Sequence, residues 1–265
     1  MDRRALFRGG LLVTAGAAIG AAAATIPRVW PRNHLPFDGG YAPAADRVDD
    51  YDVQGRITAT WHVETSEPVV AFTFDDGPGP KWTSEVLDAL DHYQVPATFF
   101  LVGQNVAAHG DLLRGRLDRH EVGNHTWSHP DLATMDAPAV GKQLARAHDT
   151  IQAVTGRAPK LFRPPYGHIG GSTLMAADKA GYSLVLWSRK MNEDKYVQDP
   201  PGQAQDIVEH ARPGQIILAH DVGPANRYVA LSQLGAMFTG LRQRGFRFVT
   251  VSELIALGRP ASDAG

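Results

Sequence analysis

The sequence predicts an α/β fold, a distorted parallel (β/α) barrel of about seven strands that forms a single catalytic domain. Short apolar runs rich in β-branched and aromatic residues, which are typical of buried strands, alternate with longer segments of helical periodicity. About seven strands is fewer than the eight of a closed barrel, so we expect the barrel to be open or distorted. An open doubly wound sheet is the alternative. No glycine-rich phosphate loop follows any expected strand, which disfavours its nucleotide-binding version.

The elements follow one another along the chain. A weakly alternating stretch at residues 56–63 indicates a peripheral strand ahead of the barrel. The barrel strands are expected at residues 69–74, 97–103, 121–125, 161–163, 183–187, 215–219 and 246–251. Helices are expected at residues 82–93, 112–117, 140–154, 172–180, 203–211 and 228–244. A last helix should follow Ser252, a suitable N-cap with Glu253 in the first turn.

Composition limits the possible functions. With 265 residues, of which 43% are hydrophobic, the chain can bury one sizeable core or at most two small ones. The formal net charge is −2 and no long basic run is present, so we expect no nucleic-acid partner. The chain has no cysteine, which excludes disulfides, thiolate metal ligands and a cysteine nucleophile. A metal would therefore need His, Asp or Glu ligands.

The first residues have the features of an export signal. Arg3 and Arg4 precede an apolar stretch at residues 11–25, and small residues at 21–24 suit a signal peptidase. The arginine pair resembles the signal of the bacterial Tat pathway. The expected parts are a Tat-like signal peptide at residues 1–31, a linker or N-terminal arm at residues 32–66 and the catalytic domain at residues 67–260. Cleavage would give a monomer that is secreted or held in the cell envelope, with no stable membrane span. An uncleaved anchor is the alternative.

Polar residues with catalytic chemistry follow several expected strands. In parallel α/β folds, the carboxyl ends of the strands carry the active site. These ends carry Asp75-Asp76, His125, Arg163 and His220-Asp221. Two adjacent carboxylates at the end of a buried strand are costly unless a cation or proton offsets their charge. Neighbours on a strand point to opposite faces, so both reach one site only if the backbone bends, as Gly77-Pro78 allows.

Two histidines could supply metal ligands. His125 and His129 are four residues apart, and one helical turn would direct both imidazoles at one cation. Such a pair alone is also typical of ordinary surface or core histidines. Asp75 and Asp76 are the available carboxylates, and one could complete a metal set of two histidines and a carboxylate while the other accepts a proton.

Four motifs together point to a known family. They are Thr73-Phe74-Asp75-Asp76-Gly77-Pro78, His125-Thr126-Trp127-Ser128-His129-Pro130, Arg163-Pro164-Pro165-Tyr166-Gly167 and Leu218-Ala219-His220. In this order and spacing they resemble the polysaccharide deacetylases of carbohydrate esterase family 4, the NodB homology domain. The resemblance covers about residues 68–257, and the family's fold is a distorted β/α barrel.

The resemblance implies a metal and a substrate pocket. Asp76, His125 and His129 would hold a divalent metal, zinc with cobalt or nickel as alternatives, and would leave positions open for water and substrate. Leu218 would line the acetyl pocket, and Trp187 would contact the substrate.

The resemblance also implies the catalytic roles. Asp75 would be the general base for the attacking water, and Arg163 would orient Asp75. The backbone N–H of Tyr166 would help to stabilise the tetrahedral oxyanion. His220 would be the acid that protonates the departing amine.

The stretch after Trp187 departs from the family. Members commonly have Asp-x-x-Asp-Trp there, which supports the Arg and the acid His. This chain has Lys190 in place of the first Asp, and Glu193 or Asp194 could replace the second. Asp221 is the remaining candidate, although adjacent residues on a strand point apart. We expect Lys190 to face solvent, and the acidic portion of a glycan is the alternative.

The expected function is that of an exported, metal-dependent deacetylase acting on an acetylated polysaccharide. N-Acetylglucosamine units of peptidoglycan or of a chitin-type glycan are the leading substrates. The alternatives are O-deacetylation of acetylxylan, a catalytically silent glycan-binding relative and a non-sugar C–N hydrolase on the same fold.

Overall fold

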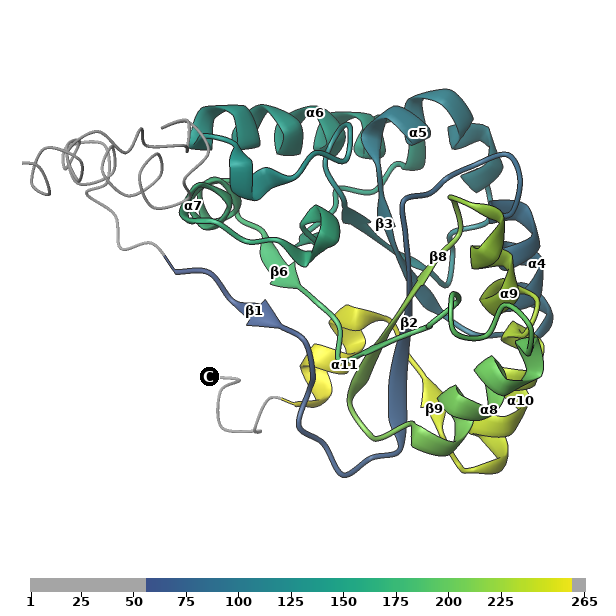
Figure 1. Cartoon of the computed structure of the whole chain (residues 1–265). Coiled ribbons are helices and arrows are strands. Elements are labelled where there is room, and N and C mark those ends of the chain that lie inside the picture. The colour runs from purple at the N-terminus through teal and green to yellow at the C-terminus, as the bar shows by residue number, and fades with distance from the viewer. Residues whose placement is uncertain (1–55, 259–265) are drawn as a thin grey trace, which may run out of the picture.

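The computed structural model describes residues 56–258 of the chain. A single parallel sheet curls into a half-barrel with helices packed around it, so the expected distorted parallel barrel is confirmed (Figure 1). The expected signal peptide, residues 1–31, and most of the expected arm, residues 32–66, lie outside the described residues. The domain boundaries therefore stay a prediction.

Within residues 56–258 the sheet has nine strands, all paired in parallel. They are β1 (Ala59–Thr60), β2 (Val69–Asp75), β3 (Ala97–Leu101), β4 (Glu121–Asn124), β5 (Leu161–Phe162), β6 (Ser183–Val185), β7 (Arg189–Lys190), β8 (Gln215–His220) and β9 (Arg247–Phe248). Their order is β1-β6-β5-β4-β3-β2-β8-β7, with β9 beside β2. Among the described strands β1 and β7 end the sheet without pairing with each other, so the barrel is open. The sequence did not predict β7, because two residues are too few for a periodic signal.

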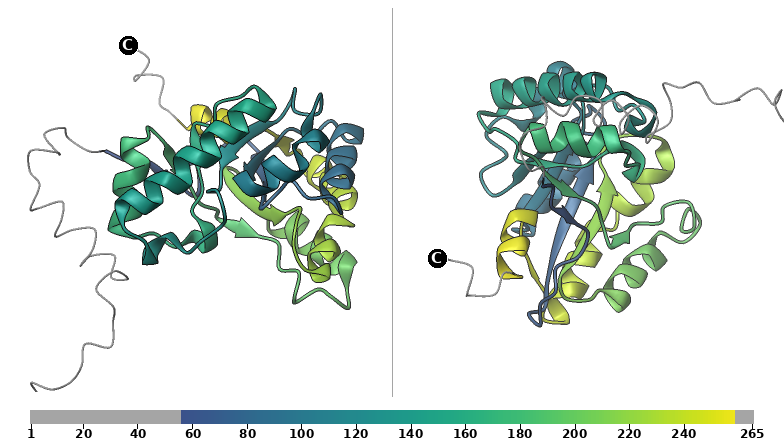
Figure 2. Two further views of the ribbon diagram at one scale, coloured as in Figure 1. Left: turned by 90° about the horizontal axis from the view of Figure 1, so that it is seen from above. Right: turned by 90° about the vertical axis from the view of Figure 1, so that its left-hand side faces the viewer.

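Helices surround the sheet. They are α4 (Thr83–His92), α5 (Gly103–His109), α6 (Ala137–Thr155), α7 (Gly171–Lys179), α8 (Pro200–His210), α9 (Tyr228–Leu231), α10 (Leu234–Gln243) and α11 (Val251–Leu257). Short 3₁₀ turns are η3 (Gly110–Leu113), η4 (Leu132–Thr134), η5 (Pro165–Gly167) and η6 (Ala225–Arg227). Helix α6 packs between α5 and α7, and α10 packs beside α4 and α8 (Figures 1 and 2). None of the helices within residues 56–258 is long and apolar enough to cross a bilayer.

Three expected helix boundaries are wrong. The helix expected at residues 112–117 is instead α5 with η3, and it begins directly after β3, where Gly103 packs against Trp127. The helix expected at residues 228–244 is divided into α9 and α10. The last helix is capped by Thr250 rather than Ser252: the Thr250 hydroxyl accepts from the Glu253 N–H, and the Glu253 carboxylate accepts from the Thr250 N–H at 2.7 Å.

The central strand β2 sets the direction of Asp75, the first carboxylate of the Asp75-Asp76 pair. Val70, Phe72 and Phe74 belong to the core between the sheet and the outer helices. Val69 and Ala71 belong to a second apolar cluster that α11 closes. Because residues two apart on a strand share a face, Thr73 and Asp75 also lie on the side of Val69 and Ala71, inside the half-barrel.

Candidate active site

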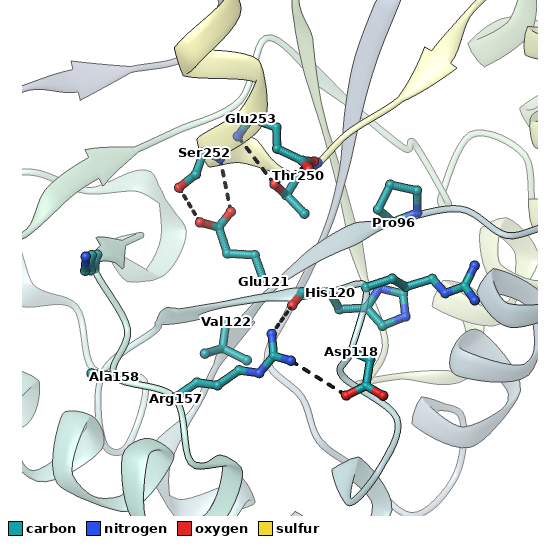
Figure 3. Close-up of a pocket in the computed structure, with 12 residues that line it drawn as sticks. Pro96, Asp118, His120, Glu121, Val122, Arg157, Ala158, Thr250, Ser252 and Glu253 are labelled. Atoms are coloured by element: carbon teal, nitrogen blue, oxygen red, sulfur yellow. Dashed lines mark hydrogen bonds and ion pairs between the residues drawn. The ribbon is translucent and has the colours of Figure 1, made fainter.

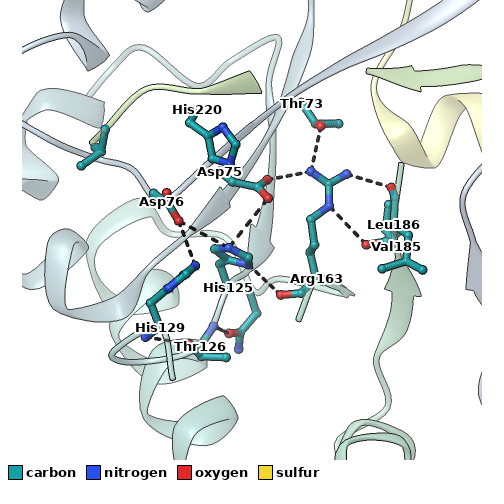
Figure 4. Close-up of polar contacts among 12 residues, drawn as sticks. Thr73, Asp75, Asp76, His125, Thr126, His129, Arg163, Val185, Leu186 and His220 are labelled. Carbon is teal, nitrogen blue, oxygen red and sulfur yellow. Dashed lines mark hydrogen bonds and ion pairs between the residues drawn. The ribbon is translucent and has the colours of Figure 1, made fainter. Parts of the chain in front are cut away.

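The carboxyl ends of the strands bring the predicted site residues together (Figure 4). Asp75 ends β2, and its register partner in β8 is His220. His125 follows β4 and Arg163 follows β5, the strand paired with β4. Residues separated by up to 145 positions in the sequence are therefore neighbours at one edge of the sheet.

The two adjacent carboxylates converge because the backbone bends between them. Asp75 is still part of extended β2, whereas Asp76 has a φ of 76°, in the left-handed region. The side-chain amide of Asn105 donates to the Asp76 carbonyl at 2.7 Å and holds this turn. The bend predicted from Gly77-Pro78 is present.

Asp76, His125 and His129 form a cluster that could hold a metal ion. One ligand atom from each lies within 4.8 Å of the other two. Oδ1 of Asp76 is 3.2 Å from Nε2 of His129 and 3.5 Å from Nε2 of His125. This oxygen is buried and has no hydrogen-bond partner among the described residues. A buried, unpaired carboxylate oxygen facing two imidazoles suits a divalent cation.

The tautomer of His125 also suits metal binding. Nδ1 of His125 is 2.7 Å from the Arg163 carbonyl, an acceptor, so Nδ1 carries the proton and donates. In the neutral imidazole, Nε2 then has a lone pair directed toward Asp76. Burial alone would raise the pKa of Asp76, but the neighbouring His125 and Arg227 hold that pKa well below its usual value.

The two histidines are presented by a loop, so the helical turn expected between them is wrong. Thr126 and His129 have positive φ values of 72° and 57°. Asn124, buried at the end of β4, accepts from the Thr126 N–H at 2.8 Å, and the Thr126 hydroxyl accepts from the His129 N–H at 3.0 Å. These local bonds stabilise left-handed residues that sequence periodicity cannot reveal.

Arg163 is fully buried and binds Asp75. Nη1 donates to Oδ1 of Asp75 at 2.6 Å and to the Thr73 hydroxyl at 2.8 Å. The other guanidinium nitrogens donate to the carbonyls of Val185 and Leu186 at 3.2 and 3.0 Å. Oδ2 of Asp75 stays directed toward His125, 3.7 Å from its Nε2. Arg163 therefore fixes the orientation of Asp75 beside the metal cluster.

Glu193 is the carboxylate that faces His220. Its Oε1 is 3.7 Å from Nδ1 of His220, a buried nitrogen without a hydrogen-bond partner among the described residues. The loop after β7 holds Glu193 in place, because Met191 donates from its backbone N–H to Leu218 at 2.9 Å and Asn192 donates to the buried Gln203 at 2.7 Å.

The other candidates for this support point elsewhere. Asp194 accepts from the side-chain amide of Asn226. Asp221 accepts from the Thr83 hydroxyl at 2.6 Å, and burial raises its pKa to about 7. Lys190 is exposed, as expected.

The three remaining predicted residues lie beside other residues of the site. Tyr166 has a φ of 60° and an exposed ring, which meets the His129 imidazole edge-on at 4.8 Å. Leu218 is buried on β8, two residues before His220. Trp187 is half-buried, 5.8 Å from the Arg163 guanidinium.

Two polar partners in the site were not predicted. The Thr73 hydroxyl supports Arg163, and its spacing of two from Asp75 was the available signal. Arg227 donates from Nη1 to Oδ2 of Asp76 at 2.6 Å. It lies 151 residues from Asp76 on an irregular turn, so no periodicity or motif indicated it.

A pocket at the opposite, amino-terminal ends of the strands contains none of the predicted site residues (Figure 3). Its polar groups serve structural contacts. Glu121 accepts from the backbone and hydroxyl of Ser252, and Arg157 donates to the His120 carbonyl at 2.8 Å. The candidate catalytic residues therefore lie at the carboxyl ends of the strands.

Comparison with known proteins agrees with this geometry. Residues 62–185 match the protein family described as Polysaccharide deacetylase. A peptidoglycan-N-acetylglucosamine deacetylase of Bacillus cereus is 36% identical over 205 residues, which cover 74% of this chain and 92% of that protein. The chain belongs to the polysaccharide deacetylase family. The expected family, carbohydrate esterase family 4, is confirmed.

Further members of the family give the same result. A peptidoglycan-N-acetylmuramic acid deacetylase of Bacillus subtilis is 34% identical over 195 residues, covering 72% of this chain and 40% of that protein. The crystal structure of a peptidoglycan N-acetylglucosamine deacetylase has a TM-score of 0.71 at 29% identity, over 80% of this chain and 96% of that chain. The expected class of enzyme, a hydrolase that deacetylates polysaccharide, is confirmed.

Proposed function

We propose that this deacetylase is metal-dependent and removes the acetyl group from N-acetylglucosamine units of peptidoglycan. The observation that carries the metal dependence is Oδ1 of Asp76, a buried and unpaired oxygen facing the Nε2 atoms of His125 and His129. Zinc suits this set of two imidazoles and one carboxylate, and cobalt or nickel are alternatives. A bound divalent metal would polarise the acetyl carbonyl and lower the pKa of a water molecule.

The chain's own groups would carry the protons. Asp75, fixed by Arg163, accepts a proton from the water that attacks the acetyl carbon. The C–N bond then breaks, and His220 donates a proton to the departing amine. The products are acetate and a free amino sugar. Glu193, whose Oε1 is 3.7 Å from Nδ1 of His220, would hold the imidazole in position for this transfer.

The rest of the site would hold the acetyl group. The backbone N–H of Tyr166 would donate to the oxyanion that forms at the carbonyl. Leu218 and Trp187 would provide the apolar walls around the methyl group, since one is buried on β8 and the other packs beside Gly167.

The names of the relatives support the choice of substrate. Two of the similar proteins are named as peptidoglycan N-acetylglucosamine deacetylases. The relative from Bacillus subtilis acts on N-acetylmuramic acid, so that sugar is the second candidate. Chitin-type glycan, acetylxylan and silent glycan binding remain alternatives to be tested. Export by the twin-arginine signal would bring a monomeric enzyme to the cell envelope, where peptidoglycan lies.

Acetate release from four substrates tests the proposal. Purified, zinc-loaded protein is incubated with peptidoglycan, N-acetylglucosamine oligomers, muramic-acid-containing fragments and acetylxylan. We expect acetate from peptidoglycan, with free amines appearing on glucosamine. Acetate from acetylxylan alone would contradict the N-deacetylase assignment. Binding to peptidoglycan with no acetate from any substrate would favour the silent relative.

A further inference from the structure

Backbone groups of neighbouring residues hold the Arg227 side chain beside Asp76. Arg227 ends η6, between β8 and α9, and its side chain is 23% exposed. Nη1 donates both to Oδ2 of Asp76, at 2.6 Å, and to the Val222 carbonyl. A Cβ on Gly223 would lie 2.6 Å from Nη1, so the guanidinium packs directly on the glycine backbone.

The two oxygens of Asp76 therefore have different surroundings. Oδ1 faces His125 and His129 and has no hydrogen-bond partner among the described residues. Oδ2 is bound by a cationic donor, Arg227. A carboxylate can bind a cation through one oxygen or through both. The guanidinium hydrogen bond occupies one lone pair of Oδ2 and places a positive charge beside it, so Oδ2 is disfavoured as a second ligand atom.

The turn that carries Arg227 is tied to both neighbouring elements. Asn226 donates to Asp194, next to the Glu193 that faces His220. On the other side, the Tyr228 hydroxyl donates to Glu85 of α4 at 2.9 Å. The position of the guanidinium is thus fixed relative to the loop that carries Glu193 on one side and to helix α4 on the other.

We propose that Arg227 is a positioning residue that restricts Asp76 to binding the metal through Oδ1 alone. This restriction leaves coordination positions open for the water and the acetyl oxygen. The inference rests on the proposed metal dependence. It adds a residue that acts through Asp76 and does not itself touch the reacting atoms.

Cobalt(II) binding tests the inference, because the visible absorption of cobalt(II) weakens as its coordination number rises to six. The spectrum of the cobalt-loaded protein is recorded for the wild type, Arg227→Met and Arg227→Lys. Arg116→Met is the matched control: Arg116 is 29% exposed and forms ion pairs with Asp88 and Asp91 at 2.8 and 2.9 Å, far from the site. Acetate release gives kcat and KM for the zinc forms, and thermal unfolding checks that each variant folds.

We expect Arg227→Met to absorb more weakly per bound cobalt than the wild type. Its kcat should fall about tenfold with little change in KM. Arg227→Lys keeps a charged donor and should recover much of both, while Arg116→Met should match the wild type. An unchanged spectrum in Arg227→Met would overturn the inference, as would a raised KM alone, which would indicate a substrate contact. A wild type that binds no cobalt would contradict the proposed function as well, so the two failures are distinguishable.

Discussion

The Arg163 guanidinium donates to the Asp75 carboxylate across 2.6 Å, and both side chains are buried. Asp75 is thereby held with its other oxygen toward the metal cluster, 3.7 Å from Nε2 of His125. Asp76 next to it turns the other way and faces the imidazoles. Two adjacent carboxylates thus have separate surroundings, and separate roles follow from them.

Asp75→Asn should show which of the two adjacent carboxylates is the base and which is the metal ligand. The amide keeps the shape of the side chain but cannot accept the proton of the attacking water. We expect turnover to fall by about 10²–10⁴-fold, the usual value of general-base action, with metal content unchanged. Elemental analysis and acetate release measure the two effects. Loss of metal in Asp75→Asn with retention in Asp76→Asn would mean that the two carboxylates have the opposite roles.

His129→Ala should weaken metal binding. Its Nε2 is 3.2 Å from Oδ1 of Asp76, so its loss would remove one of the three proposed metal ligands. Partners that only orient a ligand typically contribute about 10–100-fold in metal affinity, so we expect a loss of more than about tenfold. Competition with a chelator of known affinity measures it. His168→Ala is the control, since His168 pairs with Asp131 at 2.9 Å outside the metal cluster; an equal loss in both variants would count against the assigned ligand.

Glu193→Gln should lower turnover. The carboxylate lies 3.7 Å from Nδ1 of His220, where it would hold the imidazole in position for proton transfer to the amine. We expect kcat to fall by about tenfold or more, with little change in KM or metal content. Asp194→Asn and Asp221→Asn should keep the kcat of the wild type, because their carboxylates bind Asn226 and Thr83. An unchanged kcat in Glu193→Gln would mean that His220 acts without this support or is not the acid.

Asp221 should make folding stability depend on pH. Burial raises its pKa from 3.8 to about 7 in the folded protein. The folded state then binds more protons than the unfolded state between about pH 4 and 7, so this contribution is fully present below pH 4 and is lost as pH rises through 7. The difference in unfolding free energy between the wild type and Asp221→Asn should fall by a few kcal/mol over that window. Denaturant unfolding at several pH values measures it, and a constant difference would contradict the raised pKa.

How far the sequence predicts this site depends on how regular the backbone is. The alternation along β2 places Asp75 inside the half-barrel, and Gly77-Pro78 indicates the bend that turns Asp76. Strand ends alone bring His125, Arg163 and His220 to the same edge.

The periodicity of the sequence could not predict the irregular parts of the site. His129 reaches Asp76 through a loop with two left-handed residues. Arg227 reaches it from a turn whose place beside β2 is set by long-range packing. The sequence limited the carboxylate that supports His220 to a few candidates. Glu193 could be chosen among them only from the contacts that Gln203, Asn226 and Thr83 make in the structure.

Acetate release from peptidoglycan by metal-depleted and reloaded protein tests the central claim most directly. The protein is treated with a chelator until elemental analysis finds no metal, and activity is measured before and after addition of one equivalent of zinc. We expect activity to disappear on depletion and to return with zinc in the wild type, and not to return at the same zinc concentration in His129→Ala. Full acetate release by the metal-free protein would contradict the claim.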